Sequence, residues 1–240
     1  MTLRPVHFAV VLCTVLLAPA LIAGSPVELL RTGSFHGDEI APGSGGSWLA
    51  LVFESGGLSL HAVKATITSE EDPIVDDPGE MTGKTVTITP PVDAVALIRG
   101  IPVLKPGPVP TAVINRVMEP DGVVSLHLKN QSYSLNLRCR VRSPVDGQTQ
   151  EQCDLVLGSR GTHQILFTYL RYSDGQEMQW ASEREPVVIW AGDIDGDQRM
   201  DILLDSSDHY NGEEFTLYLS SMATGENLVQ PVAVFDQVGC

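Results

Sequence analysis

The residues of this sequence whose types and spacing could do chemistry are four aspartates that lie close together. Counted from the first, they stand at positions 1, 3, 5 and 9 of one segment: Asp193, Asp195, Asp197 and Asp201. Alternate residues of a tight loop turn their side chains toward one point, so the first three carboxylates can converge on a cation. The main-chain carbonyl of Arg199, at position 7, and the carboxylate at position 9 can complete an oxygen cage. The spacing predicts a loop that binds a hard cation, and we expect calcium.

The segments that must position this loop have the composition of β-strands. The apolar run Val187–Trp190, closely preceded by Pro186, leads into the loop, and Ile202–Leu204 leads out of it. An EF-hand needs a helix on each side and a glutamate at position 12, where this chain has Leu204. The EF-hand interpretation fails on both counts, so we expect a loop between two strands.

The pattern Gly192-Asp-Ile-Asp-Gly-Asp-x-x-x-Asp-Ile-Leu resembles the calcium loop of FG-GAP and VCBS-type repeats, which occur in integrin heads and many bacterial exported proteins. The resemblance covers about residues 190–220 and implies a loop between antiparallel strands. It also implies side-chain ligation by the four aspartates and main-chain ligation by Arg199. The pattern occurs once in the chain, so a full propeller, which needs several blades, is not expected.

One departure from the family pattern concerns Gln198, which replaces the usual second glycine, while Gly196 is present. If this position needs a left-handed backbone, a residue other than glycine costs about 1–2 kcal/mol. We therefore expect modest affinity, on the order of 10⁻⁴–10⁻³ M, as in extracellular calcium modules. The alternative is an acidic turn that holds no metal.

The rest of the chain predicts an all-β fold, built as an antiparallel sandwich or as barrel-like sheets. Trp48–Phe53 and Leu58–Ile67 flank a hairpin turn, and Lys84–Thr89 alternates between apolar and polar residues. Tyr133–Arg142 alternates over its whole length, which indicates a long half-buried strand with Cys139 pointing inward. No segment has a long 3.6-residue apolar period with caps at both ends.

The best candidate for a domain boundary is the segment 101–110, which contains four prolines. It reads as an extended connector. The sequence then divides into an N-terminal β region at 24–110 and a C-terminal β domain at 111–240 that carries the aspartate loop. These could be two small β domains, although a long edge segment inside one domain would look the same.

The N-terminus has the pattern of a signal peptide at residues 1–23. A basic residue, Arg4, precedes an apolar run at 8–17 and a small-residue exit. The alternative, an N-terminal anchor, needs a longer run of about 20 apolar residues. We therefore expect a secreted or periplasmic protein without membrane insertion after cleavage.

The formal net charge of -15 argues against nucleic acid and anionic membranes as partners, and leaves a protein or glycan partner open.

Three cysteines follow the predicted signal peptide: Cys139, Cys153 and Cys240. In an oxidising compartment the first two are the natural pair, because they close a loop of hairpin size. Such a disulfide could contribute about 3 kcal/mol to stability. The alternative is two buried free thiols. Cys240 could join either of the others, pair between chains, or stay free.

The usual catalytic motifs are missing from the sequence, so we predict no catalytic residues and favour a non-enzymatic protein in which calcium is a structural pin. One alternative is a carbohydrate-binding or hydrolytic β-sandwich, which aromatic residues around Trp180 or Trp190 would favour. Another is a calcium-dependent adhesion or envelope-assembly module.

The acidic stretches at 69–80 and 205–214 are interpreted as a solvated loop and a hairpin tip, with second metal sites as the alternative.

Overall fold

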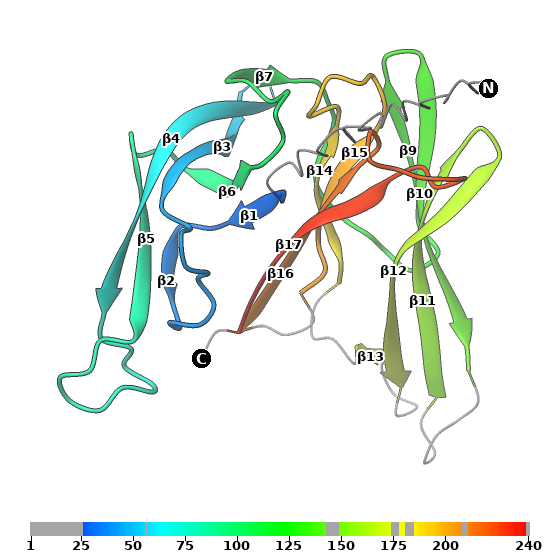
Figure 1. Ribbon diagram of the computed structural model, residues 1–240. Coiled ribbons are helices and arrows are strands. Elements are labelled where there is room, and N and C mark those ends of the chain that lie inside the picture. Colours follow the sequence, from blue (N-terminus) through cyan, green and yellow to red (C-terminus); the bar gives the residue numbers. More distant parts are fainter. Residues whose placement is uncertain are drawn as a thin grey trace, which may run out of the picture.

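The computed structural model describes residues 26–55, 57–142, 149–173, 178–180, 185–207 and 211–238. In these ranges all regular elements are strands, which form three antiparallel sheets (Figure 1). The predicted all-β, antiparallel fold is therefore confirmed. The described part of the chain contains no helix of the length and hydropathy that a membrane crossing requires. Several predictions fall outside the described residues: the signal peptide at 1–23, the middle of the loop between Cys139 and Cys153, residues 208–210 of the acidic stretch 205–214, Cys240 and the side chain of Trp180.

The first sheet has seven strands and curls into a half-barrel (Figure 1). Its strands are β1 (Glu28–Leu30), β2 (Gly33–Phe35), β3 (Gly46–Glu54), β4 (Gly57–Glu70), β5 (Gly83–Thr89), β6 (Ala94–Arg99) and β7 (Gly107–Val109). The order is β1-β6-β3-β4-β5-β2, with β7 paired to β4. The expected hairpin is present as β3 and β4, which pair from Gly46 opposite Ala65 to Glu54 opposite Gly57.

The second sheet has five strands in the order β13-β12-β11-β10-β9. Its strands are β9 (Val123–Leu128), β10 (Gln131–Val141), β11 (Thr149–Ser159), β12 (Thr162–Ser173) and β13 (Met178–Trp180). The alternation predicted for β10 holds in its first half, where Tyr133, Leu135 and Leu137 are buried. It does not extend over the whole strand, because Asn136 is also buried and Val141 is 66% exposed. Strands β10 and β11 place Cys139 directly opposite Cys153.

The third sheet lies between the other two and carries the aspartate loop. Its strands are β8 (Thr111–Val117), β14 (Val187–Gly192), β15 (Asp201–Asp205), β16 (Gly212–Leu219) and β17 (Gln230–Val238), in the order β17-β16-β15-β14-β8. One face packs on the first sheet through Ile189, Leu203 and Leu217. The other packs on the second sheet through Val188 and Ile202. Both faces of β14 and β15 are therefore apolar, which explains why these strands lack the alternation of a half-exposed strand.

The Pro-rich segment 101–110 includes β7, which pairs with β4 in the first sheet, and the strands of the other two sheets follow it in the chain. Strand β7 ends at Val109 and β8 begins at Thr111, with Pro110 between them. One hydrophobic core nevertheless joins residues of the first sheet, such as Leu51 and Ile98, to residues of the third, such as Leu203 and Leu217. The first and third sheets therefore share a core, and the division of the chain into domains at residue 110 stays a prediction.

Candidate metal centre

Two neighbouring antiparallel strands hold the ends of the aspartate loop. Gly192 at the end of β14 pairs with Asp201 at the start of β15, as expected for a loop between strands. The main-chain N–H of Asp193 donates to the carbonyl of Pro110 at 2.9 Å. A Cβ on Gly192 would lie 2.0 Å from that same carbonyl oxygen, so this close approach requires glycine. The loop is thereby fixed to the end of the Pro-rich segment.

The carboxylates of Asp193, Asp195 and Asp197 come together in this loop. Each offers an oxygen atom, and the three atoms lie within 4.8 Å of one another. Asp193 is only 1% exposed, whereas the other two side chains are partly exposed. A triad of aspartates arranged in this way could hold a metal ion, with Asp193 as its buried ligand.

Only one of the two carboxylate oxygens of Asp193 is hydrogen-bonded within the described part of the chain. Its Oδ2 accepts from the main-chain N–H of Gln198 at 3.1 Å and from Lys129 Nζ at 3.4 Å. Its Oδ1 is buried and has no hydrogen-bond partner among the described residues. Leaving a buried carboxylate oxygen unpaired is costly, because the atom has lost its water and gained nothing in return. A cation held by the triad would remove that cost.

Gln198 has the left-handed backbone conformation from which modest calcium affinity was predicted. Gly196 has φ of 82° and Gln198 has φ of 70°, so both residues are in the left-handed region. For Gln198 this costs about 1–2 kcal/mol relative to glycine. The N–H of Gln198 donates to Asp193, and its carbonyl accepts from Gln131 Nε2 at 2.9 Å. Hydrogen bonds on both sides of the residue hold the strained conformation.

Asp201 lies outside the group of three and cross-links the loop. Its Oδ2 accepts from the N–H of Ile194 at 2.9 Å, and its Oδ1 accepts from the N–H and Oγ of Ser220 at 2.8 and 2.9 Å. Burial raises the pKa of Asp201 to about 7, and the nearby Asp195 also acts to raise it. The side chain of Arg199 pairs with Asp197, Nε to Oδ2 at 2.8 Å. Metal ligation by Asp201 and by the Arg199 carbonyl stays a prediction.

Several residues that contact the loop carry no sequence signal that could have identified them. Ser220 Oγ also lies 3.0–3.1 Å from the two carboxylate oxygens of Asp197, and Ser221 Oγ donates to Asp195. Both serines follow β16, which is paired with β15. From the second sheet, Lys129, Gln131 and Tyr133 reach the loop, the last through its hydroxyl, which accepts from the N–H of Met200 at 3.3 Å. Only the strand pairing and the stacking of sheets bring these residues there.

A groove of about 760 Å³ opens beside the loop. Asp195, Asp197 and Ser221 line one part of it, and its other lining residues include Ile101, Pro102, Val103, Met222, Pro231 and Val232. None of the described residues that line it is aromatic. Trp190 is completely buried, and its Nε1 donates to Thr111 Oγ1 at 2.9 Å. Trp190, one of the two tryptophans that could have marked a ligand pocket, is therefore part of the core.

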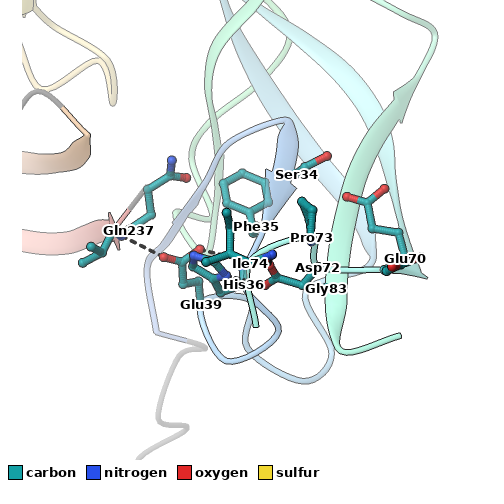
Figure 2. Close-up of a pocket in the computed structure, with 12 residues that line it drawn as sticks. Ser34, Phe35, His36, Glu39, Glu70, Asp72, Pro73, Ile74, Gly83 and Gln237 are labelled. Atoms are coloured by element: carbon teal, nitrogen blue, oxygen red, sulfur yellow. Dashed lines mark hydrogen bonds and ion pairs between the residues drawn. The ribbon is translucent and has the colours of Figure 1, made fainter. Parts of the chain in front are cut away.

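The acidic stretch at 69–80 begins in the last two residues of β4 and continues as a hydrogen-bonded turn. Asp72 in this turn is buried, so the stretch is not the fully solvated loop that the sequence predicted. Asp72 accepts from the N–H of Ile74 at 3.1 Å, and Asp76 accepts from the N–H groups of Asp72 and Thr82 at 2.8 and 2.9 Å. His36 Nδ1 bonds to Asp72 in a small pocket of about 160 Å³ (Figure 2). This bond raises the pKa of the imidazole above its ordinary value and lowers that of the Asp72 carboxyl. No group of three metal-ligating side chains is found in this turn among the described residues.

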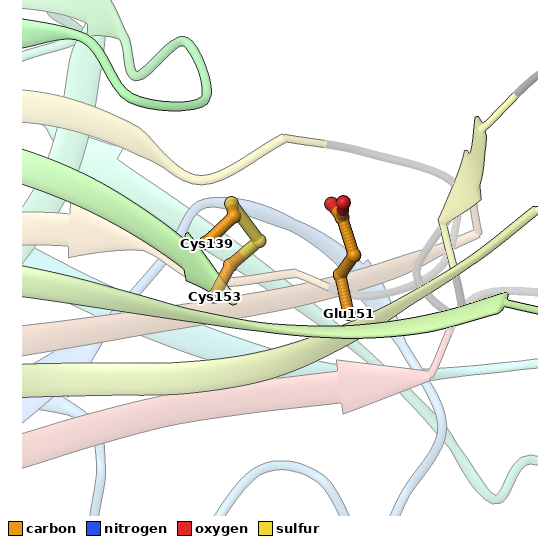
Figure 3. Close-up of side chains that lie close together, drawn as sticks. All are labelled: Cys139, Glu151 and Cys153. Carbon is orange, nitrogen blue, oxygen red and sulfur yellow. A yellow bond between two sulfur atoms is a disulfide. The ribbon is translucent and has the colours of Figure 1, made fainter. Parts of the chain in front are cut away.

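The predicted disulfide between Cys139 and Cys153 is present. Glu151 lies close to it, on the same side of the sheet (Figure 3). These three residues have the composition of a metal site, but both sulfur atoms are used in the disulfide. The disulfide indicates an oxidising, extracytoplasmic compartment.

No family model, curated protein or solved structure matches this chain.

Proposed function

We propose that the loop from Asp193 to Asp201 binds calcium and that the ion acts as a structural pin in an exported, non-enzymatic β protein. The observation that carries this proposal is the unpartnered, buried Oδ1 of Asp193 within a group of three carboxylates. An all-oxygen set suits a hard cation, and calcium takes six to eight such ligands in flexible geometry. Asp201, the Arg199 carbonyl and water are the expected further ligands, in line with the resemblance to FG-GAP and VCBS-type loops.

The structural role is supported by what the loop inserts into the protein. Ile194 packs into the core between the first and third sheets, and Met200 packs into the core between the second and third. Both side chains are buried. An ion that fixes the conformation of the loop would therefore hold two apolar anchors in place, one in each core. Mutual repulsion of the aspartates without the ion would loosen both anchors, so binding should be coupled to folding.

A second candidate is a calcium-dependent module that binds a protein partner, since the groove places two of the loop aspartates beside apolar side chains. Val103 is 60% exposed and Met222 is 54% exposed in this groove. The described residues that line the groove include no aromatic ring, so they offer no surface for the sugar stacking on which the carbohydrate-binding alternative would depend.

Thermal unfolding tests the calcium proposal. With calcium in excess over a Kd of about 10⁻⁴ M, at 10 mM, ligand linkage predicts stabilisation of about 2.7 kcal/mol and a clear rise in Tm. Asp195→Ala should abolish the rise, because it removes one member of the triad. Asp236→Ala, at an exposed site on β17, is the matched control and should keep it. Identical melting curves with calcium and with chelator would refute calcium binding.

A further inference from the structure

Lys129 places a positive charge against the buried end of the candidate metal centre. Its Nζ lies 3.4 Å from Oδ2 of Asp193, whose side chain is 1% exposed, while the lysine side chain is 45% exposed. The ammonium therefore reaches inward from the surface to the buried carboxylate. We propose that Lys129 is the counter-ion of this site in the calcium-free protein and competes with calcium for Asp193, so that it determines the affinity of the site. This inference rests on the proposed calcium function.

The hairpin that carries Lys129 holds it against the loop. Lys129 lies at the turn between β9 and β10, and two residues of β10 add hydrogen bonds to the loop on the same side. Gln131 Nε2 donates to the carbonyl of Gln198 at 2.9 Å, and the Tyr133 hydroxyl accepts from the N–H of Met200 at 3.3 Å. These contacts fix the distance between the turn and the loop. The lysine is thus positioned by packed strands rather than by its own flexible chain.

The backbone at Lys129 is also costly for a lysine. Its φ is 51°, in the left-handed region, which glycine, asparagine and aspartate adopt more easily than lysine does. Hairpin turns of this length favour those residues. A strained residue held in place by its surroundings points to a role for its side chain. Here the side chain makes the ion pair with Asp193, which supplies that role.

Electrostatics gives the size of the competition. A divalent ion held by Asp193 would lie roughly 5 Å from an ammonium that stays where it is, and Coulomb's law in a water-like dielectric then weakens binding by a factor on the order of ten. If the ammonium instead withdraws, the site loses the ion pair that calcium must replace. Either way, removing the charge of Lys129 should tighten calcium binding and leave the calcium-free protein less stable, because Asp193 then has no counter-ion.

The test compares calcium affinity and stability in Lys129→Met, Lys129→Arg and Lys64→Met. Methionine keeps most of the apolar stem and removes the charge, and arginine keeps the charge. Lys64 is an exposed lysine on β4 of the first sheet, so it controls for the change in net charge. In calorimetric titration, Lys129→Met should bind calcium about tenfold tighter than the wild type, and the other two variants should stay within twofold. In chelator, Lys129→Met should melt below the wild type.

The outcomes separate this inference from the calcium proposal. If the wild type shows no calcium binding, the proposed function fails and the inference fails with it. If the wild type binds calcium but Lys129→Met binds equally or more weakly, Lys129 has only a structural role and the inference is wrong. A second measurement covers poor folding of the variant: calcium should increase the rate at which acetic anhydride acetylates Lys129 in the wild type, measured by peptide mass spectrometry with Lys64 as internal reference. An unchanged rate would overturn the competition.

Discussion

The buried carboxyl of Asp201 should make the stability of the calcium-free protein depend on pH. Burial raises its pKa from 3.8 to about 7, so the folded protein keeps this proton over a range in which the unfolded chain has lost it. The contribution to the free energy of unfolding is therefore fully present below pH 3.8 and is lost as the pH rises through about 7. At about 1.4 kcal/mol per pH unit, the expected loss is on the order of 4 kcal/mol.

A difference measurement isolates this carboxyl from the other acids. Asp201→Asn cannot ionise, although its amide nitrogen faces the N–H of Ile194 or Ser220 and adds a constant cost. Urea unfolding of wild type and variant in chelator, from pH 4 to pH 8.5, gives the difference in free energy at each pH. The constant cost does not change with pH, so it does not affect how the difference depends on pH. The free energy of unfolding of the wild type minus that of the variant should therefore fall by about 4 kcal/mol from pH 4 to pH 8.5. Asp236→Asn is an exposed control for net charge.

Calcium should remove most of this pH dependence, because a cation beside the loop favours the ionised carboxylate. The stabilisation by calcium should accordingly be larger at pH 8 than at pH 5. The reasoning is refuted if, in chelator, the difference in free energy of unfolding between wild type and Asp201→Asn does not change with pH. Such a result would mean that the pKa of this carboxyl is the same in the folded and unfolded states.

Three further perturbations test other parts of the structure. His36→Ala should destabilise the protein more at pH 5 than at pH 8.5. The raised imidazole pKa gives stability that is present below pH 6.5 and is lost as the pH rises through the folded-state pKa. Equal shifts of the urea midpoint at the two pH values would contradict this. Replacing Cys139 and Cys153 together by serine should cost about 3 kcal/mol in urea unfolding, and non-reducing peptide mapping should find the two linked in the wild type. A link from Cys240 to either would be evidence against the pairing. Gly192→Ala should cost about 2–3 kcal/mol and weaken calcium binding, because the added Cβ meets the carbonyl of Pro110; a wild-type Tm would show that this approach is not tight.

The sequence by itself was sufficient for the features that depend on neighbouring residues. Strict alternation in segments such as Tyr133–Arg142 predicts strands because side chains of a strand point to opposite faces in turn. Asp193, Asp195 and Asp197 come together because they lie within five residues and the loop is tight. The disulfide was predictable because Cys139 and Cys153 are only 14 residues apart in the sequence.

Only the tertiary structure decided what surrounds the loop. Lys129 and Asp193 are 64 residues apart, and Ser220 and Asp197 are 23 apart, so no local pattern connects them. The same holds for Trp190, which could have lined a pocket but is buried in the core. These contacts depend on which strands pair and on the third sheet lying between the other two. Periodicity records which face of a strand is apolar, whereas the packing of the whole chain selects the partner that covers it.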